Sequence, residues 1–278
     1  AIASLPYREG LFMRPILFHI GSYGVHSYGV MLMLAIVLSV WRACDAARRR
    51  KARDSSYPIS PDDVLDVTIW IVAGIVIGAR LLFVAVDWGD YSGHIAEIFQ
   101  VWNGGLSFHG GLIGVIVALV LFAVRRKIPF LALADLIAPS AMLGYAVGRI
   151  GCFLNGCCYG APTNMPWAVR FDDDGIWTVP SHQTPLYSPL LRLFFFGVLV
   201  WMERRSKFPG QISFFYILFS AIERFIMEIW RADVTSSGGA FGLTEVQWLC
   251  VAMAIVAVIA LAVLRRRAAS SANSPALH

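Results

Sequence analysis

The chain has 278 residues, of which 58% are hydrophobic and only 15% are charged. Soluble domains carry about 25% charged residues, so a chain this apolar is not a water-soluble globular protein and its natural solvent is the bilayer. The formal net charge of +5 would suit a nucleic-acid-binding protein, but the positions of the basic residues assign them to membrane topology instead, and we expect no nucleic-acid partner.

Seven apolar stretches predict membrane-spanning helices. They cover about residues 23–43, 64–86, 106–124, 131–153, 188–202, 212–230 and 245–264. The fifth is short and the fourth is rich in glycine, so both are expected to be tilted, broken or partly buried in protein. Residues 1–18 lack an apolar core followed by a cleavage site, so the first span should stay as an uncleaved anchor. The sequence therefore predicts an all-α, polytopic membrane bundle in a single domain over residues 1–268, with a disordered tail at 269–278.

The basic residues predict the orientation of these spans. Fifteen of the 23 lysines and arginines follow the first, third, fifth and seventh stretches, in clusters at 42–53, 125–127, 204–207 and 265–267. With seven spans, all four clusters lie on one side of the membrane, and the positive-inside rule makes that side cytoplasmic. The N-terminus is then extracytoplasmic and the C-terminus cytoplasmic. The clusters need no role beyond topology and contact with anionic headgroups.

The longer loops, about 87–105, 154–187 and 231–244, fall on the opposite face. Loop 154–187 contains Pro162, Pro166, Pro180 and the acidic run 172–174, and we expect it to form a small extracytoplasmic cap. The chain shows no internal repeat, which argues against a transporter built from two related halves.

Charged residues inside apolar stretches are the first candidates for a site. Placing one in hydrocarbon costs about 2.5–3.5 kcal/mol, so such residues pair or bind something. Arg224 precedes Glu228 by one helical turn, and an internal ion pair and a ligand-binding role remain about equally plausible for it. Arg149 has glycines at 148 and 151 and no acidic residue within a turn, which favours binding of an anion such as a phosphate. Arg80 also lies within an apolar stretch.

His109 lies in the segment "NGGLSFHGGLIG" at residues 103–114. Five glycines would be costly in a plain membrane helix, so they suggest a loop that enters a helix, with His109 near the outer surface. A lone membrane histidine is often only a hydrogen-bonded packing residue. The glycines and the neighbouring Asn103 and Ser107 raise the chance of a chemical role.

Three cysteines, Cys152, Cys157 and Cys158, form a C-x4-C-C pattern. This spacing is not a standard zinc pattern, and His182 is the one obvious further extracytoplasmic ligand, so we expect no metal. A disulfide and a set of small packing residues near Arg149 are the other interpretations, of which packing is favoured. His26 and Tyr28 lie at the outer end of the first stretch, where tyrosine is usually an interface anchor.

In this order, these residues resemble the bacterial prolipoprotein diacylglyceryl transferase family. Segment 103–114 is similar to the family's His-Gly-Gly-Leu motif, and "GRIGCFLNGCCYG" at 148–160 resembles its signature that begins Gly-Arg-x-Gly-Asn-Phe. Shorter matches are "HSYG" at 26–29, "GAR" at 78–80, "DLIAP" at 135–139, "HQTPLY" at 182–187 and "EIWR" at 228–231. The matches extend from the first span to the last loop.

The chain also departs from that family's pattern. The family usually has Asn at the position of Cys152 and often Glu at that of Cys157. Its His-Pro-x-Gln-Leu-Tyr-Glu segment becomes "HQTPLYS" at 182–188, which exchanges Pro and Gln and loses the Glu. These differences bear on the geometry of the headgroup site and leave His109, Arg149 and Arg231 in place.

The resemblance implies an enzyme of the bacterial inner membrane that transfers the diacylglyceryl group of phosphatidylglycerol to the lipobox cysteine of a prolipoprotein, the first step of lipoprotein maturation. The product is a thioether, and glycerol phosphate leaves. His109 would assist deprotonation of the thiol, because the thiolate is the nucleophile. Arg149 and Arg231 would hold the phosphate. No cofactor or metal is required. Further substrate contacts would come from Arg80, Tyr28, Asn103, Asn155, Gly110 and Gly160.

Three other readings stay open at the level of sequence. One is a relative that binds lipid or lipoproteins without catalysis, which the cysteines at 152 and 157 invite. A second is a small transporter whose buried arginines and glutamates line a path. A third, more remote, is a membrane enzyme that uses Cys157 or Cys158 as its reactive thiol.

Overall fold

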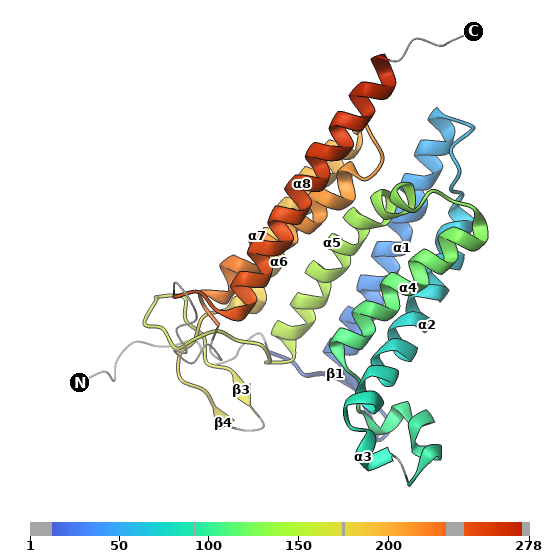
Figure 1. The fold of residues 1–278 in the computed structure, drawn as a ribbon. Helices are drawn as coiled ribbons and strands as arrows, with labels where there is room; N and C mark the ends of the chain where they lie inside the picture. The colour runs from blue at the N-terminus through green and yellow to red at the C-terminus, as the bar shows by residue number, and fades with distance from the viewer. Residues whose placement is uncertain (1–12, 92, 174–175, 232–241, 274–278) are drawn as a thin grey trace. The chain divides into compact units, whose positions relative to one another are not determined.

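The computed structural model describes residues 13–91, 93–173, 176–231 and 242–273. Within them, seven long helices coincide with the seven predicted apolar stretches, which confirms the all-α fold (Figure 1). The helices are α1 (Ser27–Arg53), α2 (Pro61–Val86), α4 (Phe108–Arg126), α5 (Phe130–Leu154), α6 (Thr184–Glu203), α7 (Gln211–Glu228) and α8 (Glu245–Asn273).

Six of these helices are long and apolar enough to cross a membrane, and α7 is the exception. Its 18 residues include three charged ones, Glu223, Arg224 and Glu228. The structure differs from the predicted boundaries at two places. Residues 23–26, expected to open the first span, form a strand, and α8 continues to Asn273, so the first part of the predicted tail is helical. Residues 274–278 of that tail lie outside the described part of the chain.

Local sequence explains where the helices begin. Ser60 caps α2 in a capping box with Asp63, and Pro61 occupies the first turn, where its missing N–H costs nothing. Ser107 caps α4 through its side chain, which accepts from the Gly110 N–H. Thr244 and Gln247 exchange side-chain and backbone hydrogen bonds at the start of α8.

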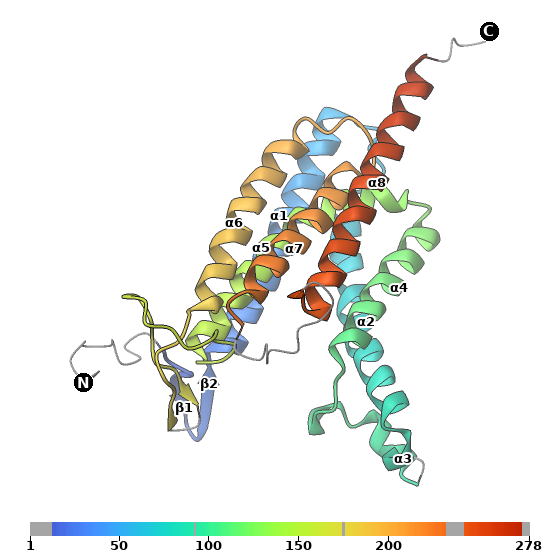
Figure 2. The same ribbon diagram turned by 60° about the vertical axis from the view of Figure 1, so that its left-hand side comes forward.

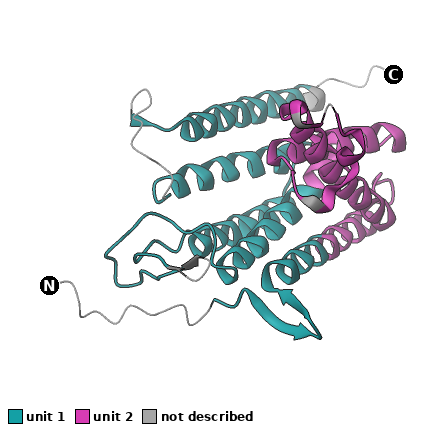
Figure 3. Cartoon of the chain, turned by 90° about the horizontal axis from the view of Figure 1, so that it is seen from below, with its two compact units in different colours: residues 1–39, 137–278 teal, residues 40–136 magenta. Residues whose placement is uncertain are grey.

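The chain divides into two compact units, one of residues 1–39 and 137–278 and one of residues 40–136 (Figure 3). In the second unit, α2 packs against α4 through glycines on both helices. A Cβ on Gly114 would overlap the Gly74 carbonyl, and one on Gly110 would overlap that of Gly78. Gly74 and Gly78 on α2, and Gly110 and Gly114 on α4, each form a small-xxx-small motif. Such motifs let two helix backbones approach closely in a membrane.

That packing changes the interpretation of the glycines at 103–114. Gly104 and Gly105 do lie in a loop, with φ of 85° and 72°, as expected. Gly110, Gly111 and Gly114, however, belong to α4, where their contacts with α2 compensate for their poor helix propensity. Ahead of this loop the chain forms the short helix α3 (Trp88–Tyr91) and the 3-10 turns η1 (Ile95–Phe99) and η2 (Val101–Asn103).

The other unit has its core between α5, α6 and α7. Met142, Leu199 and Ile212 are fully buried there, and the rings of Phe195 and Phe219 stack at 4.6 Å. In the same unit, α7 also packs against α8. An antiparallel hairpin of β1 (Ile16–Ile20) and β2 (Tyr23–His26) leads directly into α1 (Figure 2).

Residues 155–173 and 176–183 form the small cap that the sequence predicts between α5 and α6. Its backbone pairs internally through the hairpin of β3 (Asp172–Asp173) and β4 (Ile176–Trp177) and through bridges that involve Ser181. Phe171 is fully buried and stacks on Tyr159 at 5.0 Å, so the cap has a small core of its own. That this cap is extracytoplasmic remains a prediction.

Candidate functional site

A cavity of about 520 Å³ lies within the unit of residues 1–39 and 137–278. Three of the residues around it are arginines, which come from α5, from α7 and from the turn after α7. Its lining consists of Arg149, Cys158, Tyr159, Thr184, Ser188, Arg224, Met227 and Arg231. The volume falls in the range of about 300–1,000 Å³ that small-molecule sites occupy. The cavity is therefore cationic and large enough for a phosphorylated headgroup.

Arg149 is positioned by Tyr145, one turn earlier on α5. Its Nε donates to the Tyr145 hydroxyl at 3.2 Å, and its guanidinium carbon lies 5.4 Å from the centre of that ring. Among the residues that the structure describes, no carboxylate lies within 4.0 Å of Arg149. The positive charge of Arg149 is thus held in place by a neutral partner, which leaves it available to an anion.

Arg231 follows α7 in a turn that the cap holds in position. Gly160 pairs with Arg231 in an antiparallel bridge, and the Ala161 N–H donates to the Trp230 carbonyl at 2.8 Å. A Cβ on Gly160 would overlap that same carbonyl, so only glycine permits this approach. The predicted residues Gly160 and Arg231 are therefore brought together, with Gly160 acting on the backbone next to Arg231.

Arg224 and Glu228 form the internal ion pair that was one of the two sequence-based alternatives. Their closest nitrogen and oxygen are 2.8 Å apart on consecutive turns of α7. Glu228 also accepts a hydrogen bond from the Thr244 hydroxyl at 3.4 Å, which ties the start of α8 to the end of α7. Arg224 also lines the cavity. Its charge is partly offset by Glu228, whereas Arg149 has only the neutral Tyr145 as its partner.

A second ion pair, Arg192 with Glu223, joins α6 to α7 and was not predicted. The two side chains are almost completely buried, with nitrogen and oxygen 2.6 Å apart. The Arg192 guanidinium also lies 3.6 Å from the centre of the Tyr145 ring. Ser188, part of the cavity wall, donates to Glu223. A signal was present in the sequence, because Arg192 is a lone charge within one apolar stretch and Glu223 is an acidic residue within the next.

His109 lies in the other unit, at the second position of α4, and its side chain is exposed. This agrees with the expected loop that enters a helix near a surface. The Phe108 ring packs edge-on against the His109 ring at 5.7 Å. Gly110 follows at the contact with α2. Asn103 ends η2, and its side chain lies outside the described part of the structure.

Arg80 has a different environment from the one expected of a phosphate ligand. It is buried, and its guanidinium donates to four backbone carbonyls, those of Glu97, Ile98, Gly104 and Gly105. An arginine has five N–H groups, so most of its donors are satisfied by the loop ahead of α4. Arg80 therefore holds that loop in place and has few donors left for a phosphate.

Tyr28 and Asn155 lie near the end of α5. A Cβ on Gly151 would come within 3.4 Å of the Tyr28 ring, so glycine there lets α1 approach α5. The Tyr28 hydroxyl is within electrostatic reach of Arg149 and of the three nearby cysteines. The side chain of Asn155 hydrogen-bonds with Cys157. Neither residue lines the cavity, so both would act at its edge.

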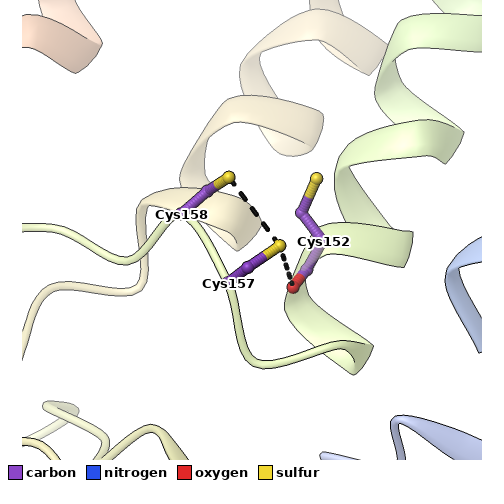
Figure 4. Close-up of side chains that lie close together, drawn as sticks. All are labelled: Cys152, Cys157 and Cys158. Atoms are coloured by element: carbon purple, nitrogen blue, oxygen red, sulfur yellow. Dashed lines mark hydrogen bonds between the residues drawn. The ribbon is translucent and has the colours of Figure 1, made fainter. Parts of the chain in front are cut away.

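Cys152, at the end of α5, and Cys157 and Cys158, in the following loop, converge (Figure 4). All are free thiols, and their sulfur atoms lie within 4.8 Å of one another. Cys158 is exposed and the other two are half-buried, so they do not form the packed apolar set that the sequence favoured. Hydrogen bonds with Cys152 and Cys157, and then the charges of Arg149 and Arg231, lower the pKa of the Cys158 thiol.

A model of the prolipoprotein diacylglyceryl transferase family matches residues 15–263. The chain belongs to this family. A phosphatidylglycerol–prolipoprotein diacylglyceryl transferase of Methylibium petroleiphilum is 36% identical over 88% of this chain and 93% of its own length. A protein of the same name from Nitratidesulfovibrio vulgaris is 38% identical over 85% of this chain and 88% of its own length. Another from Thermosynechococcus vestitus is 34% identical over 74% of this chain and 77% of its own length.

This member of the prolipoprotein diacylglyceryl transferase family is a multi-pass membrane protein by its six long apolar helices. Of the predicted site residues, Arg149 and Arg231 share one cavity, and Gly160 positions the second of them. His109, Gly110 and Arg80 belong to the other unit. Sequence reasoning missed Tyr145, Thr184 and Ser188, which are uncharged and hard to tell from packing or belt residues.

Proposed function

We propose that this chain transfers the diacylglyceryl group of phosphatidylglycerol to the lipobox cysteine of prolipoproteins, the first step of lipoprotein maturation. The cysteine sulfur forms a bond to the terminal carbon of the diacylglycerol. The bond between that carbon and the phosphate oxygen breaks, and glycerol phosphate leaves with the electron pair. The thiol proton passes to a base, because the thiolate is the nucleophile.

The observation that carries this proposal is that Arg149 and Arg231 border the same cavity. The departing phosphate gains negative charge as the carbon–oxygen bond breaks. Fixed guanidinium groups stabilise such developing charge more than they stabilise the intact diester, and this difference accelerates the reaction. The names of the relatives specify phosphatidylglycerol and a prolipoprotein as substrates, and their similarity extends over most of this chain.

His109 is the proposed base. It is exposed at the start of α4, where a substrate can reach it, and histidine is the side chain that most often serves as a general base. The nucleophile belongs to the substrate, so the cysteines of this chain have no part in the chemistry. Tyr28, Asn103, Asn155, Gly110 and Gly160 are proposed secondary contacts or positioning residues.

Both substrates are membrane-bound, so the proposal includes access from the lipid phase and a location in the bacterial cytoplasmic membrane. The described residues of the cap, 155–173 and 176–183, have a backbone that holds Arg231, which makes the cap a candidate gate for the lipobox peptide. If proteolytic cleavage within the cap leaves transfer intact, the gate does not exist.

The deciding experiment uses purified protein in detergent with phosphatidylglycerol and a lipobox peptide. Release of glycerol phosphate is measured for the wild type, for Arg149→Ala and for Arg49→Ala. Arg49 is a matched control because it is largely exposed on α1 and pairs with Asp45. We expect release that requires the peptide cysteine, a loss of about 100-fold or more for Arg149→Ala, and no change for Arg49→Ala.

Two results would contradict parts of this proposal. A well-folded wild type that binds phosphatidylglycerol but releases no glycerol phosphate would be a lipid-binding relative and not an enzyme. Full turnover by His109→Ala, with the wild-type pH profile, would show that His109 is not the base. It would not affect the assignment of Arg149 and Arg231 as phosphate ligands.

A further inference from the structure

The three cysteines at the end of α5 offer a set of ligands that the proposed reaction does not use. Cys157 and Cys158 have their sulfur atoms 3.8 Å apart, and Cys152 completes a triangle in which every sulfur–sulfur distance is below 4.8 Å (Figure 4). Thiols that only fill space are buried, as Cys44 and Cys250 are in this chain. These three are half-buried or exposed, so solvent and ions can reach them.

We propose that Cys152, Cys157 and Cys158 form a binding site for a thiophilic metal ion such as Zn²⁺. With zinc–sulfur bonds of about 2.3 Å, the sulfurs of a tetrahedral site lie about 3.8 Å apart. The Cys157–Cys158 separation already has this value. The other two distances need a contraction of at most about 1 Å, which side-chain rotation provides. Thiolate ligands select zinc and copper(I) over hard cations.

The charges around the cluster favour its metal-bound form. Zinc displaces the protons that remain on the three thiols, and the complex of Zn²⁺ with three thiolates carries one negative charge. Arg149 and Arg231 exert a favourable electrostatic effect on the Cys158 thiolate, so they would stabilise this complex too. A trithiolate site leaves a fourth position open to water.

The position of Cys158 couples this site to the cavity. Cys158 lines it together with Arg149 and Arg231, and the Cys158 carbonyl accepts from the Thr184 hydroxyl at 2.8 Å. A metal–thiolate complex would compete with a phosphate for the same two guanidinium groups. Bound metal should therefore inhibit transfer, a consequence that rests on the proposed function, whereas the binding site itself does not.

Zinc binding is measured first, by competition with a chromophoric chelator, on reduced protein in detergent. The matched control is Cys44→Ala/Cys250→Ala, which keeps the cluster. We expect one ion per chain for the wild type and for this control, and affinity at least about tenfold lower for Cys157→Ala. Equal affinity in the Cys157→Ala variant would overturn the site.

A second measurement needs no variant. Wild-type protein is treated with iodoacetamide with and without Zn²⁺, and the modified cysteines are identified by mass spectrometry. Zinc should protect Cys157 and Cys158, and a chelator should restore their modification. If the three thiols react as fast at saturating Zn²⁺ as they do without it, the proposal is wrong. It is also wrong if fresh protein holds two of them as a disulfide.

Transfer is then assayed with the Cys44→Ala/Cys250→Ala protein. Zinc at concentrations that fill the site should raise the KM for phosphatidylglycerol, and a chelator should reverse this. Bound zinc without any effect on KM would refute the coupling alone. If the protein shows no transfer, the proposed function fails, while the titration and the alkylation still decide whether the metal site exists.

Discussion

At the scale of single residues, Tyr145 links the proposed phosphate ligand to the buried ion pair. Its hydroxyl accepts from Arg149, while its ring lies against Arg192. The two contacts use different parts of one side chain and can be separated by mutation. Tyr145 is a positioning residue, because it does not line the cavity itself.

We expect Tyr145→Phe to reduce transfer without unfolding the protein. The substitution keeps the ring under Arg192 and removes only the acceptor for Arg149. A hydrogen bond to a charged group contributes about 1.5 kcal/mol, which corresponds to a loss of about tenfold in kcat/KM, and much of it should appear in the KM for phosphatidylglycerol. Steady-state kinetics and thermal unfolding test this. Tyr145→Leu should also lower the unfolding temperature, and equal kinetics for Tyr145→Phe and wild type would show that the hydroxyl positions nothing.

A buried ion pair joins α6 to α7. Arg192 and Glu223 are 6% and 2% exposed as side chains, so neither charge can recover its hydration if the other is lost. Removing one partner of a buried pair costs about 3–5 kcal/mol, whereas replacing both by uncharged groups of similar volume is often neutral. We expect Glu223→Ala to lower the unfolding temperature strongly and Arg192→Met/Glu223→Gln to recover most of it.

The control for this pair is Asp45→Ala, which breaks the exposed pair with Arg49 on α1. The side chains of Arg49 and Asp45 are 62% and 35% exposed, and exposed ion pairs contribute little to the free energy of unfolding. The unfolding temperature in detergent should not change measurably. Similar losses for the exposed and buried pairs would mean that burial does not determine the contribution of Arg192 and Glu223.

At the scale of secondary-structure elements, the glycines of α2 and α4 decide how closely two helices approach. In a bilayer the lipid tails are as apolar as leucine, so helices associate through close van der Waals contact instead of through the hydrophobic effect. Gly114 and Gly74 place backbone against backbone. The groove beside this contact is almost entirely apolar, with walls that include Ile77, Leu81 and Val117.

We expect Gly114→Ala to destabilise the protein by about 1–3 kcal/mol, because the new methyl group must displace the Gly74 carbonyl. Gly197→Ala is the matched control. Gly197 lies within α6 with open space where a Cβ would stand, so alanine should be neutral or stabilising by up to about 1 kcal/mol. Thermal unfolding of both variants gives the comparison, and equal stability would exclude a steric role for Gly114.

The same elements show what sequence could and could not predict. Hydropathy located all seven long helices, because length and apolar composition are properties of each segment alone. It placed the start of the first span too early, since residues 23–26 are apolar enough for a helix but pair with β1. Arg149 and Arg231 were identified through local glycines and motifs. The partners of Arg80 and Arg192 were not, because they depend on which distant segments meet.

At the scale of the whole molecule, the basic clusters predict one orientation for every span. They follow the first, third, fifth and seventh apolar stretches, and the structure confirms a long helix at each. The ends of α1, α4, α6 and α8 would then be cytoplasmic and the cap extracytoplasmic. An odd number of crossings is required for this arrangement. This orientation therefore predicts that α7 also spans the membrane, with its three charged residues paired, two of them with each other and one with Arg192.

Thiol labelling in intact cells tests this orientation directly. Cys158 is exposed in the cap, whereas Cys44 and Cys250 are buried, so a membrane-impermeant maleimide should label Cys158 without permeabilisation. The comparison is Ser206→Cys in a Cys152→Ala/Cys157→Ala/Cys158→Ala background, which removes the reachable thiols of the cap side and places one at an exposed position between α6 and α7, next to Arg205. It should react only after the cells are opened. The reverse pattern would invert the whole topology, and labelling of both thiols in sealed cells would show that α6 does not cross the membrane, because Cys158 and residue 206 lie at its two ends.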